Sequence, residues 1–253
     1  MLANEPALIL RNKTLMTLFI NKLLSKVGVQ VKRYPDADLK RRMRIVHHFK
    51  IDTLLDVGAN AGQYAKQMRE LGYAKRIISF EPVQEAFQQL SKAAKHDGSW
   101  IVNQYALGDK EETVTINVSQ NSFSSSILNI LPEHVQSAPS SAFIAQQETR
   151  IKKLDTVFDS FTTGSNNIML KIDVQGFEKK VLAGAEASLQ KIKIIQLEMS
   201  LVPLYQNEWL FHEVLEYLTQ KGFQLYSLEN GFFNKETGQL LQADGIFLNT
   251  QIS

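Results

Sequence analysis

The chain has 253 residues, of which 44% are hydrophobic and 21% charged, with 28 basic residues against 26 acidic ones. This composition is typical of a folded globular protein and excludes disorder over most of the length. A net charge of +2 argues against nucleic acid as the main partner, and the absence of cysteine excludes disulfides, thiolate catalysis and cysteine-ligated zinc.

The first fifty residues have a helical pattern. Apolar residues recur at roughly helical spacing over residues 5–30, Pro35 interrupts the pattern, and a second helix is expected over residues 36–49. Within that helix the run Lys40–Arg44 is basic. A solvated helix face is the favoured interpretation, and docking of an anionic acceptor or a membrane surface is the alternative. Residues 1–50 are therefore expected to form an N-terminal helical segment.

No early stretch is long enough to cross a bilayer. The most apolar run, residues 15–20, is far shorter than the roughly 20 residues that a membrane-spanning helix needs. No small-residue cleavage site follows it, which disfavours a signal peptide. We expect a cytoplasmic protein without a transmembrane segment, in which peripheral membrane contact through residues 1–44 stays open.

From residue 51 onward, short apolar strands alternate with helices. This alternation predicts a doubly wound, Rossmann-like α/β domain over residues 51–253, with a mostly parallel sheet and an antiparallel C-terminal strand. The expected strands are residues 54–57, 76–80, 101–105, 113–118, 168–172, 194–197, 224–227 and 245–248. The expected helices are residues 62–71, 83–95, 178–190 and 211–221.

An inserted polar loop near residues 119–148 interrupts the alternation. Its first part, Ser119–Ser141, is rich in Ser, Asn and Pro. A polar loop of this length inside a compact domain is usually a lid or is disordered. The lid interpretation gains support because the loop follows strands that lead to the expected site. His134 lies in this loop and is the histidine with the best claim to a catalytic role.

Ligands of an open α/β sheet bind beyond the carboxyl ends of its strands, and three motifs fall there. The first is Asp56-Val57-Gly58-Ala59-Asn60-Ala61-Gly62. Gly58 permits a sharp turn with close approach of a ligand, and Gly62 permits the next helix to begin against the sheet. Asn60 tolerates a left-handed backbone better than most residues. Alone, this motif also fits an ordinary strand-to-helix turn.

The second motif is Phe80-Glu81-Pro82, at the end of the next strand. Glu81 follows Asp56 by 25 positions, where an acidic residue can accept hydrogen bonds from both hydroxyls of a ribose. A carboxylate here can also cap the following helix. Two motifs in register favour ribose binding.

The third motif is Leu170-Lys171-Ile172-Asp173-Val174-Gln175-Gly176. Asp173 is expected to face the same crevice, although it can also cap the helix that begins near Glu178. Glu198 follows the neighbouring strand, so that both carboxylates can project toward an acceptor.

These motifs, together with Ala106-Leu107-Gly108-Asp109 and Leu241–Phe247 and in this order, resemble those of the FkbM-type methyltransferases. The resemblance runs from about Ile51 to Leu248. It implies S-adenosylmethionine as cofactor and O-methylation, often of sugars or other hydroxylated metabolites.

By position, the resemblance places Gly58, Asn60 and Gly62 around the methionine part of the cofactor, Glu81 at the ribose, and Ala106 and Leu107 at the adenine. Many methyltransferases have a second glycine where this chain has Asn60. The full set expected at the cofactor is Asp56, Gly58, Ala59, Asn60, Gly62, Glu81, Pro82, Ala106, Leu107 and Asp173.

An alcohol acceptor must lose its proton, which requires a base or a metal. Asp173 and Glu198 are the expected catalytic residues, acting as a base or as oxygen ligands of a divalent ion. In the alternative interpretation Asp173 binds the ammonium group of the cofactor, and Glu198 caps a helix or pairs elsewhere.

Two other functions compete. An NAD-dependent oxidoreductase needs Gly-x-Gly-x-x-Gly, whereas the corresponding positions here are Gly58, Asn60 and Gln63. A non-catalytic nucleotide-binding module would keep the fold without the chemistry. We expect a small-molecule or glycan-type hydroxylated acceptor and no nucleic-acid partner; the sequence predicts no oligomeric state.

Overall fold

The structure, a computed structural model, describes residues 20–29, 31 and 34–252. The chain divides into two compact units, residues 1–42 and 43–253. Helix α2 (Ala37–His48) spans this division, and a short 3₁₀ helix, η1 (Ser25–Val27), lies in the first unit. Much of the helical pattern predicted over residues 5–30 lies outside the described residues. Within the described part, no helix has the length and apolar character needed to span a membrane.

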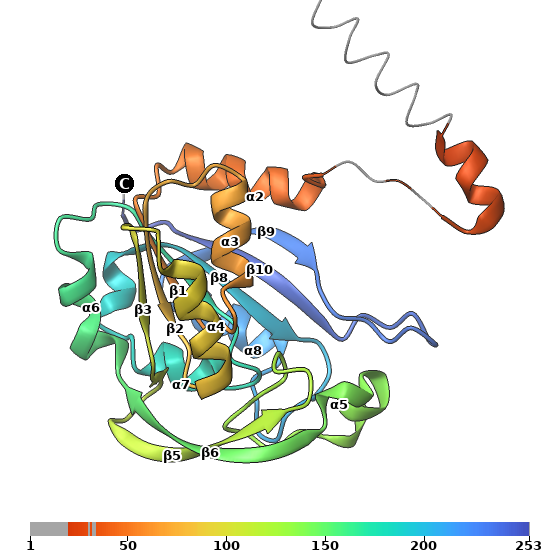
Figure 1. The fold of residues 1–253 in the computed structure, drawn as a ribbon. Coiled ribbons are helices and arrows are strands. Elements are labelled where there is room, and N and C mark those ends of the chain that lie inside the picture. Colours follow the sequence, from red (N-terminus) through yellow and green to blue (C-terminus); the bar gives the residue numbers. More distant parts are fainter. Residues whose placement is uncertain (1–19, 30, 32–33, 253) are drawn as a thin grey trace, which may run out of the picture. The chain divides into compact units, whose positions relative to one another are not determined.

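The second unit is built on a seven-stranded sheet with the order β3-β2-β1-β7-β8-β10-β9 (Figure 1). Five neighbouring strands from β3 to β8 are parallel, and β10 runs antiparallel to both β8 and β9. The doubly wound, Rossmann-like prediction is therefore confirmed. The strands are β1 (Thr53–Val57), β2 (Arg76–Phe80), β3 (Trp100–Asn103), β7 (Ile168–Ile172), β8 (Ile192–Ser200), β9 (Phe223–Asn230) and β10 (Gln242–Asn249).

Helices cover both faces of this sheet, and their bounds are α3 (Gln63–Glu70), α4 (Gln84–Ala94), α6 (Leu154–Thr162), α7 (Glu178–Ala183) and α8 (Phe211–Gln220). Successive residues of a strand point to opposite faces. Leu54 accordingly packs in a cluster with Met68 of α3 and Leu90 of α4, whereas Leu55 packs in a cluster with residues of α6, α7 and α8. All five residues of β1 are buried, as expected for a strand covered on both faces.

A second, three-stranded sheet has the order β4-β6-β5, with β4 (Ala106–Leu107), β5 (Glu112–Ser119) and β6 (Phe143–Lys152). The paired strands β5 and β6 form a separate green layer in Figure 1. The sequence predicted neither this sheet nor β6 and α6, so residues 143–148 of the expected loop are in fact strand. Between β5 and β6 lie the short helices α5 (Pro132–Ser137) and η2 (Pro139–Ser141).

Two predicted elements end clearly earlier than expected. The helix expected over residues 178–190 is split into α7 and the 3₁₀ helix η3 (Ser188–Lys191). Gly184 follows α7 and packs so closely on the backbone of Gly108 that a Cβ there would lie 1.8 Å from the Gly108 carbonyl oxygen. The strand expected over residues 101–105 ends at Asn103, since the chain then leaves the main sheet to form β4.

Candidate functional site

A cavity of about 200 Å³ opens at the carboxyl ends of the central strands, on both sides of the β1–β7 junction. The chain moves outward from β1 to β3 and later fills the other half of the sheet from β7, so this junction is the switch point where ligands of such folds bind. The predicted site residues that line the cavity are Gly58, Asn60, Glu81, Pro82, Ala106, Leu107, Asp173 and Glu198. Three others, Asp56, Ala59 and Gly62, are buried behind this lining.

The turn after β1 has the left-handed backbone that its residues favour. Gly58, Asn60 and Gly62 have φ values of 77°, 48° and 80°. A Cβ on Gly58 would lie 1.8 Å from the carbonyl oxygen of Asp173, and one on Gly62 would lie 2.9 Å from the Trp100 ring. Among the described residues, the backbone of Asp173 therefore leaves no room for a side chain at Gly58, and the core side chain of Trp100 leaves none at Gly62. The left-handed backbone predicted at Asn60 is confirmed.

Glu81 is 5% exposed and lies between two backbone donors. Its Oε2 accepts a hydrogen bond from the Asn60 N–H and its Oε1 one from the Val83 N–H, both at 2.7 Å. Val83 is the N-cap of α4, so the carboxylate serves the turn and the helix together. Burial raises the pKa of Glu81 to about 7. Each carboxylate oxygen can accept a second hydrogen bond, which leaves the group able to accept from two hydroxyls.

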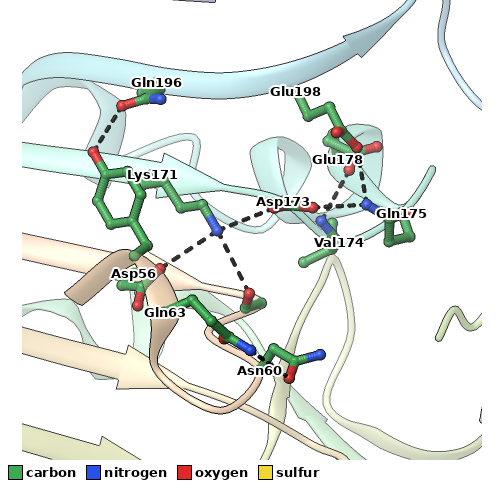
Figure 2. A network of polar contacts seen from close by, with 12 residues as sticks. Asp56, Asn60, Gln63, Lys171, Asp173, Val174, Gln175, Glu178, Gln196 and Glu198 are labelled. Carbon is green, nitrogen blue, oxygen red and sulfur yellow. Dashed lines mark hydrogen bonds and ion pairs between the residues drawn. The ribbon is translucent and has the colours of Figure 1, made fainter. Parts of the chain in front are cut away.

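Lys171 is the buried centre of a polar cluster (Figure 2). Its Nζ lies 3.5 Å from Asp56 Oδ1, 3.3 Å from Asp173 Oδ2 and 3.5 Å from the Gly58 carbonyl oxygen. Burial acts to lower the pKa of Lys171, but the charges of Asp173 and Asp56 outweigh it and raise the pKa above its ordinary value. The ammonium group thus ties the turn after β1 to the turn after β7.

Asp56 was expected at the cofactor, yet it is fully buried and serves this cluster instead. The Ser79 hydroxyl donates to Asp56 Oδ2 at 3.1 Å, and burial raises the pKa of the Asp56 carboxyl. Lys171 had no predicted role. The signal that could have revealed it is a lysine inside the otherwise apolar strand Ile168–Ile172, because a buried charge requires a partner.

The two predicted catalytic carboxylates are joined by Gln175, which sequence reasoning also left without a role. Gln175 Nε2 donates to Asp173 Oδ1 at 2.8 Å and to Glu198 Oε2 at 2.9 Å (Figure 2). Burial, followed by the charges of Asp173, Asp244 and Glu178, raises the pKa of Glu198 well above its ordinary value. A carboxylate with a raised pKa is a stronger base than an ordinary one, and inside a cavity it is suited to take up a proton from a bound acceptor.

Part of the inserted segment borders the cavity. The cavity strap, defined here as residues 122–127, contributes Ser122, Phe123, Ser125, Ser126 and Ile127 to the lining. The Asn60 amide donates to the Ser122 hydroxyl at 3.2 Å, and the Ser126 hydroxyl donates to the Gln175 carbonyl at 2.6 Å. The strap therefore contacts the turn after β1 and the turn after β7.

His134 does not have the position that a catalytic histidine requires. It lies in α5, is 3% exposed, and packs against the rings of Tyr205 and Phe232. Burial lowers the pKa of His134 to about 4. Its imidazole is outside the lining of the cavity, so the role considered for it from the sequence loses its support.

The described residues contain no group of three or more His, Asp or Glu side chains arranged to hold a metal ion. Asp173 accepts hydrogen bonds through both of its oxygens, and Glu198 accepts two through Oε2. N–H donors thus engage both oxygens of Asp173 and one oxygen of Glu198.

A glycine turn after β1, a buried acid after β2 and a cavity at the switch point define a Rossmann-like domain with a site for a nucleoside cofactor. The family model described as "Methyltransferase FkbM domain" matches residues 56–225, and the chain belongs to this family. S-adenosylmethionine-dependent methyl transfer follows from that membership. A comparison with curated proteins finds no match.

Solved structures resemble the chain distantly. An uncharacterised protein from Listeria monocytogenes serotype 4b has 10% identity and a TM-score of 0.48, over 85% of this chain and 68% of that one. TehB from Haemophilus influenzae has 10% identity and a TM-score of 0.46, over 91% and 67%. The methyltransferase domain of bacterial CtHen1 has 10% identity and a TM-score of 0.44, over 83% and 97%.

Proposed function

We propose that this protein transfers a methyl group from S-adenosylmethionine to a hydroxyl group of a sugar or another hydroxylated small molecule. The observation that carries the proposal is the pair of carboxylates, Asp173 and Glu198, at one end of a cavity whose other parts fit a nucleoside. Bound S-adenosylmethionine supplies a methyl group that is already activated on a sulfonium. The protein must then align the acceptor, exclude water and remove the hydroxyl proton.

The residues of the cavity fit these tasks. Ala106 and Leu107 offer an apolar surface for the adenine, and the Glu81 carboxylate can accept from the ribose hydroxyls. Asp173 lines the same cavity and is the acid available for the ammonium group of the methionine part. These assignments keep the cofactor residues expected from the sequence, apart from the three that lie behind the lining.

Glu198 is the proposed base. Its raised pKa means that the ionised form holds a proton firmly once it accepts one, which suits removal of a proton from an alcohol. The proton would move to Glu198 as the acceptor oxygen bonds to the methyl carbon and the carbon–sulfur bond breaks, leaving S-adenosylhomocysteine. Because N–H donors already engage both oxygens of Asp173 and Oε2 of Glu198, we propose that Glu198 acts as a base, in preference to binding of a divalent ion by the two carboxylates.

Calorimetry with S-adenosylhomocysteine and with NAD tests the cofactor. S-adenosylhomocysteine should bind and NAD should not, because Gly-x-Gly-x-x-Gly is incomplete at Asn60 and Gln63. Binding of NAD alone would overturn the methyltransferase assignment for this cavity.

Release of S-adenosylhomocysteine, measured with a panel of glycosides, polyols and RNA, tests the acceptor. Glu198→Gln should lower turnover with the active hydroxylated acceptor by about 10²–10⁴-fold, the usual contribution of a general base. Its affinity for S-adenosylhomocysteine should change little. Turnover with RNA alone would overturn the acceptor class, and binding without turnover for any acceptor would favour a non-catalytic module.

A further inference from the structure

We propose that Gln175 is a positioning residue that holds Asp173 and Glu198 side by side and directs one oxygen of Glu198 toward the acceptor. This inference rests on the proposed function, because it concerns how the proposed base is held. It adds a residue to which neither the motifs nor the family match assigns a role. Three features of the structure carry it: the amide bridge, the tyrosine that orients it, and a second amide on Glu198.

The amide bridge matches donors to acceptors. The Gln175 amide nitrogen carries two protons, and it meets two carboxylate oxygens, Asp173 Oδ1 at 2.8 Å and Glu198 Oε2 at 2.9 Å. Two carboxylates that share a site repel each other when both are ionised. A neutral amide that donates to both reduces this repulsion without adding a positive charge.

Tyr205 orients the amide. Its hydroxyl is buried and donates to Gln175 Oε1 at 2.8 Å, which is shorter than its 3.2 Å contact with the Ser124 carbonyl oxygen. If the amide were rotated by 180°, Oε1 would face the two carboxylates, and three acceptors would meet without a proton between them. The observed orientation is therefore the one compatible with ionised Asp173 and Glu198.

The backbone holds Gln175 as well. The residue has a left-handed φ of 55°, and its carbonyl accepts from the Ser126 hydroxyl at 2.6 Å. Such a backbone is uncommon for a residue other than glycine and persists when its surroundings fix it. The turn after β7 therefore presents the amide from a fixed position.

A second amide completes the positioning of Glu198. Gln242 of β10 donates from Nε2 to the same oxygen, Glu198 Oε2, at 2.7 Å. Both amides thus bind Oε2, which assigns Oε1 to the acceptor hydroxyl. The charged groups that act on Glu198 from the surrounding elements are Lys171 and Asp173 near the end of β7, Glu178 of α7 and Asp244 of β10.

The test compares Gln175→Met and Gln175→Glu with a matched control, Gln220→Glu. Gln220 is exposed on α8 and also donates to a carboxylate, that of Glu216 at 3.2 Å. Both Gln175 variants should lower kcat at least tenfold, while KM and the affinity for S-adenosylhomocysteine change less than about threefold. They should also shift the acid limb of the kcat–pH profile to higher pH, because each removes donors to the ionised form of Glu198. The control should change none of these quantities.

A second variant and a second measurement keep the test decisive if the Gln175 variants fold poorly. Tyr205→Phe removes the hydroxyl that orients the amide and should shift the acid limb in the same direction, with a smaller loss of kcat. A ¹³C NMR titration of the Glu198 carboxyl needs no acceptor, and its midpoint should rise in both Gln175→Met and Tyr205→Phe.

The outcomes separate this proposal from the proposed function. If the wild-type protein neither binds S-adenosylhomocysteine nor turns over, the proposed function fails. If the wild-type protein is active while Gln175→Met or Tyr205→Phe keeps its kcat, its pH profile and its Glu198 midpoint, the positioning role alone is overturned.

Discussion

Gly58 is the residue at which the first and third motifs meet. Its φ of 77° is left-handed, and the Asp173 carbonyl occupies the space that a Cβ would need. Gly58→Ala should therefore lower the free energy of unfolding by at least about 2 kcal/mol, since the left-handed backbone alone costs about 1–2 kcal/mol and the clash adds to it. Urea unfolding measures the change. Gly98→Ala, where a Cβ meets no atom within 4 Å, should stay within about 0.5 kcal/mol of the wild type.

Glu81 allows a prediction about cofactor binding and pH. Loss of a charged acceptor costs about 1.5–3 kcal/mol, so Glu81→Ala should weaken S-adenosylhomocysteine binding by roughly ten- to a hundredfold. The ionised carboxylate accepts the hydroxyl protons, and burial raises its pKa to about 7. Wild-type affinity should therefore fall as the pH is lowered through 7, and Glu81→Gln should flatten that dependence in calorimetry. Equal affinities of the wild type and Glu81→Ala, with exposed Glu85→Gln as control, would remove Glu81 from the site.

Residue spacing predicted which residues lie at the end of a strand. It did not predict which hydrogen-bond or ion-pair partners their side chains have. Glu81 and Asn60 were found from spacing and turn chemistry, both of which are local. The partners of Asp56 could not be predicted because they come from pairing across strands: it stands opposite Ser79 on β2 and Lys171 on β7. Residues in register on adjacent strands point to one face of a sheet, so that cluster follows from the register, which the sequence does not reveal.

At the scale of elements, the buried apolar strands could be predicted, whereas the largely exposed strand β6 could not. β1, β2 and β7 lie at the centre of the sheet, where burial on both faces produces short apolar runs. In β6 only Thr149 and Ile151 are buried, so this strand lacks the alternation that reveals a half-buried strand. The inserted segment was therefore expected to be loop throughout.

The cavity strap, residues 122–127, should become more ordered along its whole length when ligand binds. Its hydroxyls bond to Asn60 and to Gln175, which belong to the two turns that a cofactor would contact. Backbone amides of the strap should exchange hydrogen faster without ligand and more slowly with S-adenosylhomocysteine and acceptor, as expected of a lid. Residues 168–172 of β7 serve as an internal reference, because they are buried in both states. Equal exchange of the strap in the two states would contradict the lid interpretation.

At the scale of the whole second unit, the fold brings several acids to one cavity: Glu81 and Glu198 line it, and Glu178 accepts from the N–H of Val174, which also lines it. The carboxyl groups of Asp56, Glu81, Glu178 and Glu198 all have raised pKa values, and the ammonium group of Lys171 lies next to Asp56. A stable core alone would not favour this arrangement, because buried carboxyls cost free energy unless they are paired or protonated. The arrangement is expected where a site needs groups that exchange protons near neutral pH.

This arrangement makes stability depend on pH in a direction that can be worked out for Glu178. Burial raises its pKa to about 8 in the folded protein, against an ordinary value of 4.5. A folded-state pKa above the unfolded one contributes stability that is full below the unfolded value and is lost as the pH rises through the folded value. Between pH 7 and 8, one such group lowers the free energy of unfolding by about 1.4 kcal/mol at most. His134, with a folded pKa of about 4, titrates below this window.

Urea unfolding at pH 7 and pH 8.5 tests the dependence on Glu178. The wild type should be less stable at pH 8.5, and Glu178→Gln should lose less stability over the same interval because an amide does not titrate there. The substitution keeps an oxygen that can accept from the Val174 N–H, as Glu178 Oε1 does at 3.0 Å, so it changes the charge more than the contact. Glu213→Gln, at the start of α8, is the matched control, because Glu213 also accepts a hydrogen bond from a backbone N–H, that of Leu210 at 2.8 Å. If the wild type and Glu178→Gln lose the same stability between the two pH values, Glu178 is ionised throughout and its buried site stabilises the charge by contacts other than the Val174 N–H.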